Sequence, residues 1–339
     1  MATIKEVAER AGVAPSTVSY VLSGSRKISP DTQRAVRTAI AELGYTPRAS
    51  ARTLRSARSD VLVLAVPRVP GKYRAVDGRF AIDISDAARG HGYDLLMMTD
   101  PEGVGGLRRV AGSGLADAAV LMAVQERDPR IDALRALRFP TALLGHSDDP
   151  DLPRVDLDWK AAVTLAVRET VSAGHHRIVF LASADHEIRA RRGYALSGLA
   201  GARQAAADSG ADLRIHPSSG DPGRLRELLH RLLRTEPAPT ALIVQHLVLL
   251  PLVREVATAH GLLGSGPPAV VLVGSLPDDP GCLRLPRIEL PVEQMSTAVV
   301  RLAVEAIGAT PRTAGAAEPV HQLIPPRLAS GPQVPRPAP

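Results

Sequence analysis

The side chains best suited to chemistry lie near the start of the chain, and the chemistry they suit is hydrogen bonding to a polyanion. Residues 1–58 carry ten Lys and Arg side chains against four acidic ones, while the remaining residues balance, so this segment holds the entire net charge of +6. A small cationic segment on a neutral body favours a polyanionic partner for that segment and a separate task for the body. Within it, Ser16, Ser19 and Tyr20 share one side of an expected helix, where polar tips can reach base edges in a DNA groove.

Three short helices are expected to position these side chains. Thr3 and Glu6 form a capping box that starts the first helix, whose apolar residues recur every three or four positions until Gly12 ends it. Pro15 suits the first turn of a second helix. Ser29-Pro-Asp opens a third helix, which Gly44 ends.

Two short helices joined by a tight turn and closed by a third form a helix-turn-helix unit, which places its second helix in the major groove. The alternative is a solvated three-helix bundle without a nucleic-acid partner. The charge excess of residues 1–58 argues against that alternative.

Five motifs cover most of this head: Ala2-Thr-Ile-Lys-Glu-Val-Ala-Glu-Arg-Ala-Gly-Val, Ser16-Thr-Val-Ser, Ser29-Pro-Asp-Thr, Ala41-Glu-Leu-Gly-Tyr-Thr-Pro and Ala51-Arg-Thr-Leu-Arg. Together they closely resemble the head of the LacI/GalR family of bacterial transcription regulators. The resemblance implies a homodimer that binds a pseudo-palindromic operator in double-stranded DNA and acts as a repressor. It also implies a small-molecule effector. The longest apolar runs, such as Val61 to Pro67, are far shorter than a membrane span, so we expect no attachment to a membrane.

The base-reading positions of that family correspond here to Pro15, Ser16 and Tyr20. Pro15 departs from the usual hydrogen-bonding side chains and offers only apolar contact, so Ser16 and Tyr20 carry more of the direct readout. For Tyr20 the alternative is an aromatic ring that covers the core of the head. The predicted DNA-binding residues are Thr3, Pro15, Ser16, Thr17, Ser19, Tyr20, Arg26, Lys27, Arg52, Leu54 and Arg55.

By resemblance, Arg48 to Ser56 is the hinge helix of the family. It is too short to be stable alone, so we expect it to order only on DNA. Leu54 matches the leucine that the family wedges into the minor groove, which would kink the duplex. Arg52 and Arg55 flank it and can meet phosphate or the narrowed groove. The alternative for Leu54 is an ordinary core residue.

From Val61 onward, short apolar runs alternate with helix-length segments, which predicts parallel sheets covered on both faces. The predicted fold is therefore an all-α helix-turn-helix head followed by an α/β core with doubly wound parallel sheets. The runs that predict strands are Val61 to Val66, Tyr93 to Met98, Ala118 to Met122, Thr141 to Leu144, Arg177 to Ala182, Ala241 to Val244 and Ala269 to Val273.

Sparser motifs in the body continue the resemblance: Gly92-Tyr-Asp-Leu-Leu, Val155-Asp-Leu-Asp-Trp, Gly174-His-His-Arg-Ile and Pro325-Pro-Arg-Leu. They imply two periplasmic-binding-protein-like subdomains, with the chain crossing between them near Asp158, Pro286 and Ala314. The expected boundaries are a head at 1–47, a hinge helix and linker at 48–59, an N-terminal subdomain at 60–157 and 287–313, a C-terminal subdomain at 158–286 and 314–330, and a disordered tail at 331–339.

The expected effector cleft departs from the family. The arginine that precedes a Gly-aromatic pair is replaced by Gly198 or, in another register, by Ala190, although Arg189 and Arg191 stand close by. An Asn-Asp pair is replaced by His246-Leu247, and an aspartate by Leu276, with Asp278 and Asp279 just beyond. Sugar hydroxyls need paired donors and acceptors in a buried site. Three interpretations stay open: a ligand other than a typical sugar, a pocket built differently, or no effector. The candidate effector-binding residues are Asp158, Trp159, Arg189, Arg191, His246 and Leu276.

Other function classes find less support. The chain has no Gly-x-Ser-x-Gly, Walker or Gly-x-Gly-x-x-Gly motif and no metal-binding spacing of histidines, so we expect neither an enzyme nor a metal or other cofactor. A secretory signal is not visible, and the single Cys282 fits a reducing compartment, so we expect a cytoplasmic protein. The alternatives are a DNA-binding regulator without effector control and, less favoured, a solute-binding protein.

Overall fold

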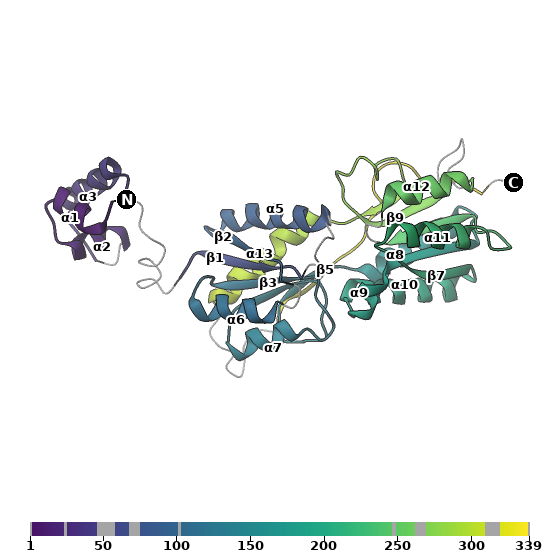
Figure 1. Ribbon diagram of the computed structural model, residues 1–339, viewed down its shortest axis with the longest axis horizontal. Coiled ribbons are helices and arrows are strands. Elements are labelled where there is room, and N and C mark those ends of the chain that lie inside the picture. Colours follow the sequence, from purple (N-terminus) through teal and green to yellow (C-terminus); the bar gives the residue numbers. More distant parts are fainter. Residues whose placement is uncertain are drawn as a thin grey trace.

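A computed structural model provides the structure of the chain (Figure 1). It consists of a helical head and two α/β subdomains that together form the core. The structure describes residues 2–23, 26–45, 58–67, 75–100, 103–245, 249–261, 269–308 and 319–337.

The head is the predicted three-helix unit. Thr3 caps its first helix through the expected capping box with Glu6, and Gly44 ends its third helix in the left-handed conformation with φ of 58°. Apolar residues of all three helices form one small core, in which Val7, Val18 and Val36 are fully buried. The helices are α1 (Ile4–Arg10), α2 (Pro15–Ser23) and α3 (Pro30–Leu43).

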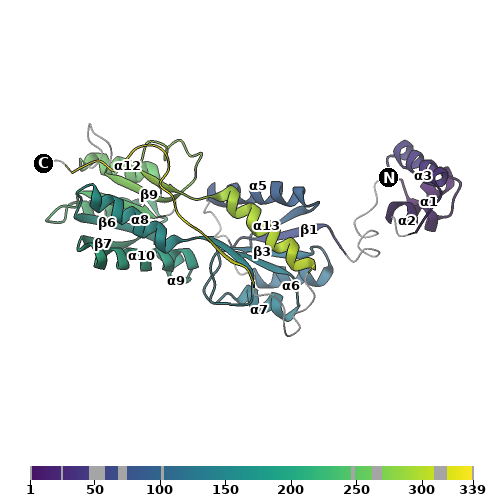
Figure 2. The ribbon, with the colours of Figure 1, turned by 180° about the vertical axis from the view of Figure 1, so that it is seen from behind.

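The N-terminal subdomain is built on a six-stranded parallel sheet with the strand order β11-β5-β4-β3-β1-β2. Helices α5 and α13 pack against each other on one face (Figure 2), and α6 and α7 cover the other. The elements are β1 (Val61–Ala65), α5 (Ala75–Gly90), β2 (Asp94–Met98), α6 (Val104–Ser113), β3 (Ala118–Met122), α7 (Pro129–Ala136), β4 (Thr141–Leu144), β5 (Arg154–Leu157), α13 (Val292–Gly308) and β11 (His321–Ile324).

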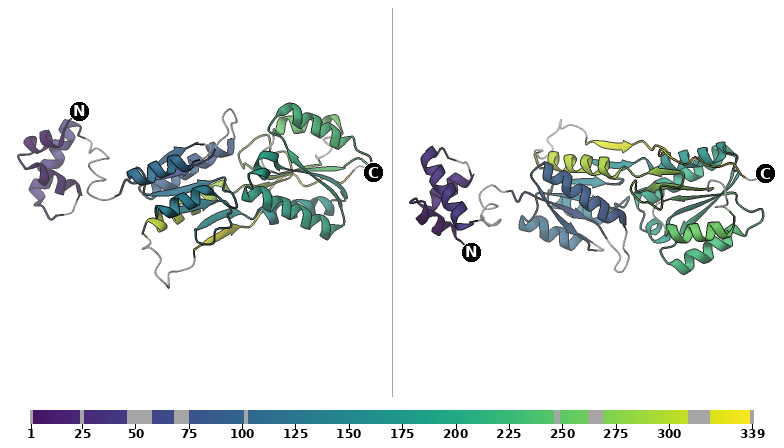
Figure 3. Two further views of the ribbon diagram at one scale, coloured as in Figure 1. Left: turned by 60° about the horizontal axis from the view of Figure 1, so that its bottom comes forward. Right: turned by 90° about the horizontal axis from the view of Figure 1, so that it is seen from above.

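The C-terminal subdomain repeats this plan on a five-stranded parallel sheet with the order β10-β9-β8-β6-β7. Helices α8 and α10 cover one face and α11 and α12 the other, so the strands lie between two helical layers (Figure 3). The elements are α8 (Trp159–Ser172), β6 (Arg177–Ala184), α9 (Asp185–Arg189), α10 (Gly193–Ser209), β7 (Asp212–Ser218), α11 (Pro222–Leu233), β8 (Ala241–Gln245), α12 (Leu250–Ala259), β9 (Val270–Ser275) and β10 (Arg287–Glu289).

The alternating direction of apolar side chains along the strands explains why helices cover both faces of each sheet. In β1, Leu62 and Leu64 face the core under α5 and α13, whereas Val63 and Ala65 face α6 and α7. Successive side chains of a strand point to opposite faces, so an uninterrupted apolar run requires a helix layer on each side. The predicted fold class, an all-α head and two doubly wound parallel-sheet subdomains, is confirmed.

Two of the expected crossing points are wrong by several residues. Strand β10 pairs with β9, so residues 287–289 belong to the C-terminal sheet and the second crossing follows them. Strand β11 pairs with β5, so residues 321–324 belong to the N-terminal sheet and the third crossing follows Ile324 rather than lying near Ala314. An apolar run predicts that a strand exists, but hydrogen-bond pairing with a distant segment decides which sheet it joins.

The expected disorder of 331–339 also differs from the structure over the residues it describes. Val334 is partly buried against the core cluster that the two subdomains share. The carbonyl oxygen of Pro335 lies 2.8 Å from Nε2 of His175, whose Nδ1 lies 3.0 Å from the hydroxyl of Thr240. A buried histidine thus holds a Pro-rich segment that has no secondary structure of its own. Within the described ranges, no helix is long and apolar enough to cross a bilayer.

Candidate nucleic-acid interface and ligand cleft

Helix α2 presents the polar face that its sequence predicts. Val18 is fully buried in the head, whereas Pro15 and Ser16 are exposed and Thr17 and Ser19 are partly exposed. Pro15 occupies the start of the helix, where a missing N–H costs no hydrogen bond. Side chains at the first turn of such a helix are the ones that reach base edges when it enters a major groove.

Tyr20 lies at the edge of the same face and is 36% exposed, so its ring is not part of the core of the head. The guanidinium carbon of Arg26 stands 5.6 Å from the centroid of this ring, within the range of a cation–π contact. Arg26 and Lys27 are both exposed. The contact places one cation next to the aromatic side chain at the edge of this exposed face.

Thr3 caps helix α1, in addition to the DNA contact predicted for it. Its hydroxyl accepts from the backbone N–H of Glu6 at 3.3 Å, and its own N–H donates to the Glu6 carboxylate at 2.6 Å. These bonds lower the pKa of Glu6. The predicted hinge-helix contacts Arg52, Leu54 and Arg55 lie outside the described residues.

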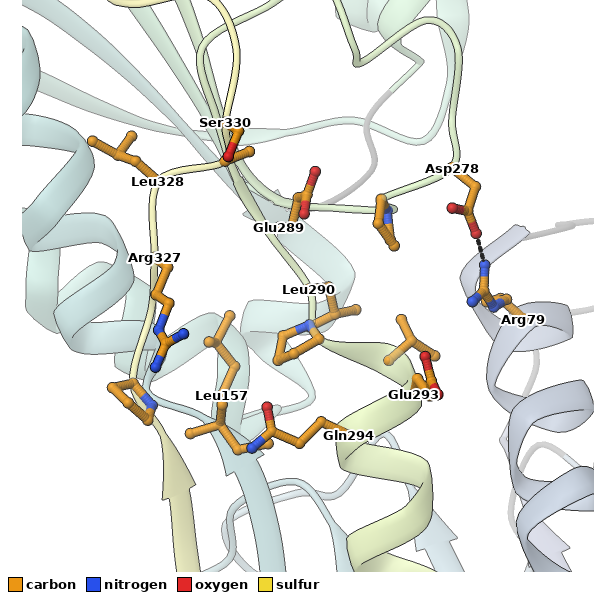
Figure 4. A pocket seen from close by; sticks show the side chains of 16 residues that line it. Arg79, Leu157, Asp278, Glu289, Leu290, Glu293, Gln294, Arg327, Leu328 and Ser330 are labelled. Atoms are coloured by element: carbon orange, nitrogen blue, oxygen red, sulfur yellow. Dashed lines mark hydrogen bonds and ion pairs between the residues drawn. The ribbon is translucent and has the colours of Figure 1, made fainter.

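A cavity of about 730 Å³ lies where the chain crosses between the two subdomains (Figure 4). Leu157, Leu290 and Ile324, which come from the three crossing segments, contribute its apolar floor, together with prolines that follow two of them. Because every crossing borders it, a bound molecule would contact the parts of the chain that must bend if the subdomains move. The lining mixes these apolar residues with charged and polar side chains, so it offers contacts to both apolar and polar parts of a small molecule.

Charged side chains stand around the rim of this cavity. Arg79 on α5 forms ion pairs with Asp83, at 2.9 Å, and with Asp278 of the C-terminal subdomain. Figure 4 shows this second pair closing one side of the cavity. Glu289 pairs with Arg287 at 2.6 Å. Glu293 and Arg327 also line the cavity and are exposed.

The five predicted effector residues that the structure describes do not line this cavity. Asp158 instead caps α8 and accepts from the N–H of Ala161 at 2.9 Å, and Trp159 is only 3% exposed. Leu276 is buried as well. The position predicted from His246 lies outside the described residues.

The two predicted arginines are engaged in ion pairs. Arg189 pairs with Asp185 within α9, and Arg191 pairs with Glu126 of the other subdomain. The cavity residues Arg79 and Glu293 carried no recognisable signal in the sequence. Arg327 did, because it stands in the Pro325-Pro-Arg-Leu motif, and Asp278 follows directly on the segment where the resemblance places an aspartate.

Neighbouring side chains pack tightly on two glycines near the expected ligand positions: Gly198, where the resemblance places an arginine, and Gly274, two residues before Leu276. A Cβ at Gly198 would lie 2.3 Å from the side-chain amide of Gln245, and one at Gly274 would lie 2.4 Å from the ring of Trp159. Gln245 donates to the carbonyl of Tyr194 at 2.9 Å. No partner for its Oε1 is present in the described part of the chain. The protein's own side chains therefore occupy the space where a larger residue at Gly198 would project.

Comparison with known proteins agrees with this architecture. A sequence profile described as "Bacterial regulatory proteins, lacI family" matches residues 3–48, and one described as "Periplasmic binding proteins and sugar binding domain of LacI family" matches residues 81–246. The HTH-type transcriptional regulator AglR of Rhizobium meliloti (strain 1021) is 29% identical over 77% of this chain and 75% of AglR.

Two further proteins are similar over most of the chain. The HTH-type transcriptional repressor PurR of Haemophilus influenzae (strain ATCC 51907) is 28% identical over 71% of this chain and 72% of PurR. The crystal structure of the lac repressor dimer bound to operator and the anti-inducer ONPF has a TM-score of 0.79 at 21% identity, over 97% of this chain and 98% of that one, which shows a shared fold. The chain therefore belongs to the LacI family of bacterial regulatory proteins.

Proposed function

We propose that this protein is a sequence-specific DNA-binding transcriptional repressor that acts as a homodimer on a pseudo-palindromic operator. The observation that carries the proposal is the exposed polar face of α2, with Ser16 and Tyr20 outward, in a head whose sequence matches the family over residues 3–48. Since its target is chromosomal DNA, we place the protein in the cytoplasm.

In this proposal the DNA contacts come from helix α2, from the segment that follows it and from the hinge segment. The exposed face of α2 reads base edges, Arg26 and Lys27 neutralise phosphates, and Leu54 enters the minor groove between Arg52 and Arg55. Phosphate contacts release counterions, so affinity falls steeply as salt rises.

Genomic footprinting of the purified protein tests the proposal directly. The expected result is a set of protected sites that share a two-fold symmetric sequence. The variant Leu54→Ala should then weaken operator binding and reduce bending in a gel-shift assay, while binding to unrelated DNA changes little. An equal loss on both kinds of DNA would refute the wedge role, and the absence of any protected palindrome would refute the function.

We further propose that a small molecule bound in the cavity at the crossings controls the repressor. Its apolar residues and its charged rim, where Glu293 and Arg327 are exposed, favour a polar ligand with an apolar face. Titration calorimetry against a panel of sugars, nucleosides and amino acids tests this. Binding that Arg327→Ala weakens would support the site.

A second candidate is a regulator without effector control. It is favoured by Gly198, which stands where the resemblance places an arginine, and by the side chain of Gln245, which occupies the space into which a larger residue there would project. The two candidates separate on one measurement, because only the first allows a metabolite to change the affinity for the operator.

A further inference from the structure

A short antiparallel bridge joins the two core subdomains at a place distinct from the three crossings. Arg192, directly before α10 of the C-terminal subdomain, pairs with Gln125, which follows β3 of the N-terminal one. The N–H of Glu126 donates to the carbonyl of Arg191 at 3.0 Å, and the N–H of Gly193 donates to the carbonyl of Val124 at 3.1 Å. These are the paired backbone bonds of a two-stranded ladder, formed between parts that otherwise fold separately.

Side chains reinforce the bridge on both sides. The guanidinium of Arg192 donates to the carbonyl of Ala123, and Arg191 forms an ion pair with Glu126. Burial lowers the pKa of Arg192. Arg192 is half-buried between the two subdomains, and its hydrogen bond to the carbonyl of Ala123 would be lost if they separated.

At the bridge, the backbones near Gly193 and His146 are so close that no space for a side chain is left between them. A Cβ at Gly193 would lie 2.5 Å from the carbonyl oxygen and 2.9 Å from the Cβ of His146, which follows β4 in the opposite subdomain. No side chain larger than hydrogen fits at this position. Ala123 and Arg191 both adopt a left-handed backbone with φ of 51°, which residues other than glycine rarely do. Strain of this kind persists only where surrounding contacts impose it.

We propose that residues 191–193, which we call the latch, hold the two subdomains of the core together in the absence of any ligand. The inference rests on the proposed function, since it concerns how the cleft of that regulator is controlled. Every donor and acceptor of the latch belongs to the chain itself, so a bound molecule need not contribute to these contacts. A ligand that opens the core must break the bridge at 123–126, whereas a ligand that fits the closed core meets no such cost.

Gly193→Ala is the sharpest test, because the three atoms nearest to the added methyl group all belong to His146 of the opposite subdomain. Gly193 is the first residue of α10, so alanine does not disfavour the helix itself. Gly105→Ala is the matched control, since Gly105 lies on helix α6, where a Cβ would have nothing within 4 Å. A second variant, Arg192→Ala, removes the guanidinium but leaves the backbone path free.

The measurement is the distance between spin labels on Arg109→Cys of α6 and Arg203→Cys of α10, by pulsed electron resonance on the full-length protein. Both positions are exposed, and the native Cys282 is fully buried. Mass spectrometry of the same samples establishes that no small molecule copurifies. We expect one narrow distance distribution for the native and Gly105→Ala proteins. For Gly193→Ala we expect a longer or second distance, and for Arg192→Ala a smaller shift the same way.

Identical distributions in all four proteins would overturn the latch. So would a native distribution that is already broad and becomes narrow only when a ligand is added. If Gly193→Ala were to unfold, Arg192→Ala would still decide the question. A gel-shift assay on the same samples separates this test from that of the proposed function: absence of operator binding would refute the function, while the distances would still support or refute the latch.

Discussion

The indole nitrogen of Trp159 donates a hydrogen bond of 3.0 Å to Oδ1 of Asp156, across the first crossing between the core subdomains. Asp156 lies in β5 and Trp159 is the first residue of α8, so the bond spans the residues that leave one sheet and enter the other subdomain. The ring of Trp159 also packs on Gly274 and lies 5.9 Å from the ring of Tyr194. Trp159 thus fixes the direction of the crossing and does not line the cavity.

Asp156→Asn should make stability less dependent on pH. Burial raises the pKa of Asp156 to about 7, although the bond from Trp159 acts in the opposite direction. Its pKa in the unfolded chain is about 3.9. Between these values the folded protein keeps a proton that the unfolded chain has lost, so the free energy of unfolding falls as pH rises through this range.

With about 1.4 kcal/mol for each pKa unit, the loss from Asp156 between pH 5 and pH 8 is on the order of 3 kcal/mol. Urea unfolding of the native and Asp156→Asn proteins at both pH values measures it. The variant should lose less stability over this range than the native protein does. Asp94→Asn, at an exposed position, is the control. Equal pH dependence in all three proteins would contradict the prediction.

Asp128→Asn should destabilise the N-terminal subdomain severely. Arg130 donates to both carboxylate oxygens of Asp128, at 2.8 and 2.6 Å, and also to the carbonyls of Ala65 and Met122, and both charged side chains are almost fully buried. Removing one charge of a buried pair leaves the other uncompensated, which costs about 3–5 kcal/mol.

Urea unfolding at pH 7 measures this loss. Glu305→Gln, which breaks the exposed pair with Arg301, is the control and should cost less than about 1 kcal/mol. Burial acts to raise the pKa of Asp128, but the hydrogen bonds and charge of Arg130 outweigh it and keep that pKa below its ordinary value. The stabilisation is therefore complete above the unfolded pKa and disappears as pH falls through the lowered one. Similar losses in the two variants would contradict the prediction.

Gly201→Ala should loosen the packing of α8 against α10. A Cβ at Gly201 would lie 2.4 Å from the carbonyl oxygen of Lys160, and a backbone atom in a helix cannot rotate away. Overpacking of this kind costs about 1–3 kcal/mol. Gly112→Ala, at an exposed position of α6 with open space around it, should instead add about 0.5–1 kcal/mol. Thermal unfolding of both variants checks the opposite signs.

Arg26→Ala and Ser16→Ala should affect DNA binding in different ways. A side chain that contacts phosphate contributes to all sequences, so Arg26→Ala should reduce the slope of log affinity against log salt by about one. Ser16 faces base edges in the proposed complex, so Ser16→Ala should leave this slope unchanged and lower discrimination between operator and mismatched DNA by about 1 kcal/mol. Fluorescence anisotropy over a range of salt concentrations measures both, and the reverse pattern would contradict the assignment.

Local patterns in the sequence determined the head. Its caps, its apolar spacing and its closing Gly44 act over a few residues, and the structure has all three helices where these signals lie. The seven apolar runs of the core likewise became β1, β2, β3, β4, β6, β8 and β9. These helices and strands can be predicted because burial of one or both faces of an element makes apolar residues recur at a regular spacing along the sequence.

Only the tertiary structure decided which strands share a sheet and which side chains share a site. Strand β7 has a polar sequence because it lies at the edge of its sheet, so no apolar run predicts it. Strands β10 and β11 join their sheets by pairing with segments that are distant in the sequence. The cavity gathers Arg79, Asp278 and Arg327 from elements separated by up to 248 positions in the numbering. The bridge between Gln125 and Arg192 is equally non-local. Contacts between residues far apart in the sequence form only when helix and sheet layers pack together. The local spacing of residue types along the chain therefore does not predict them.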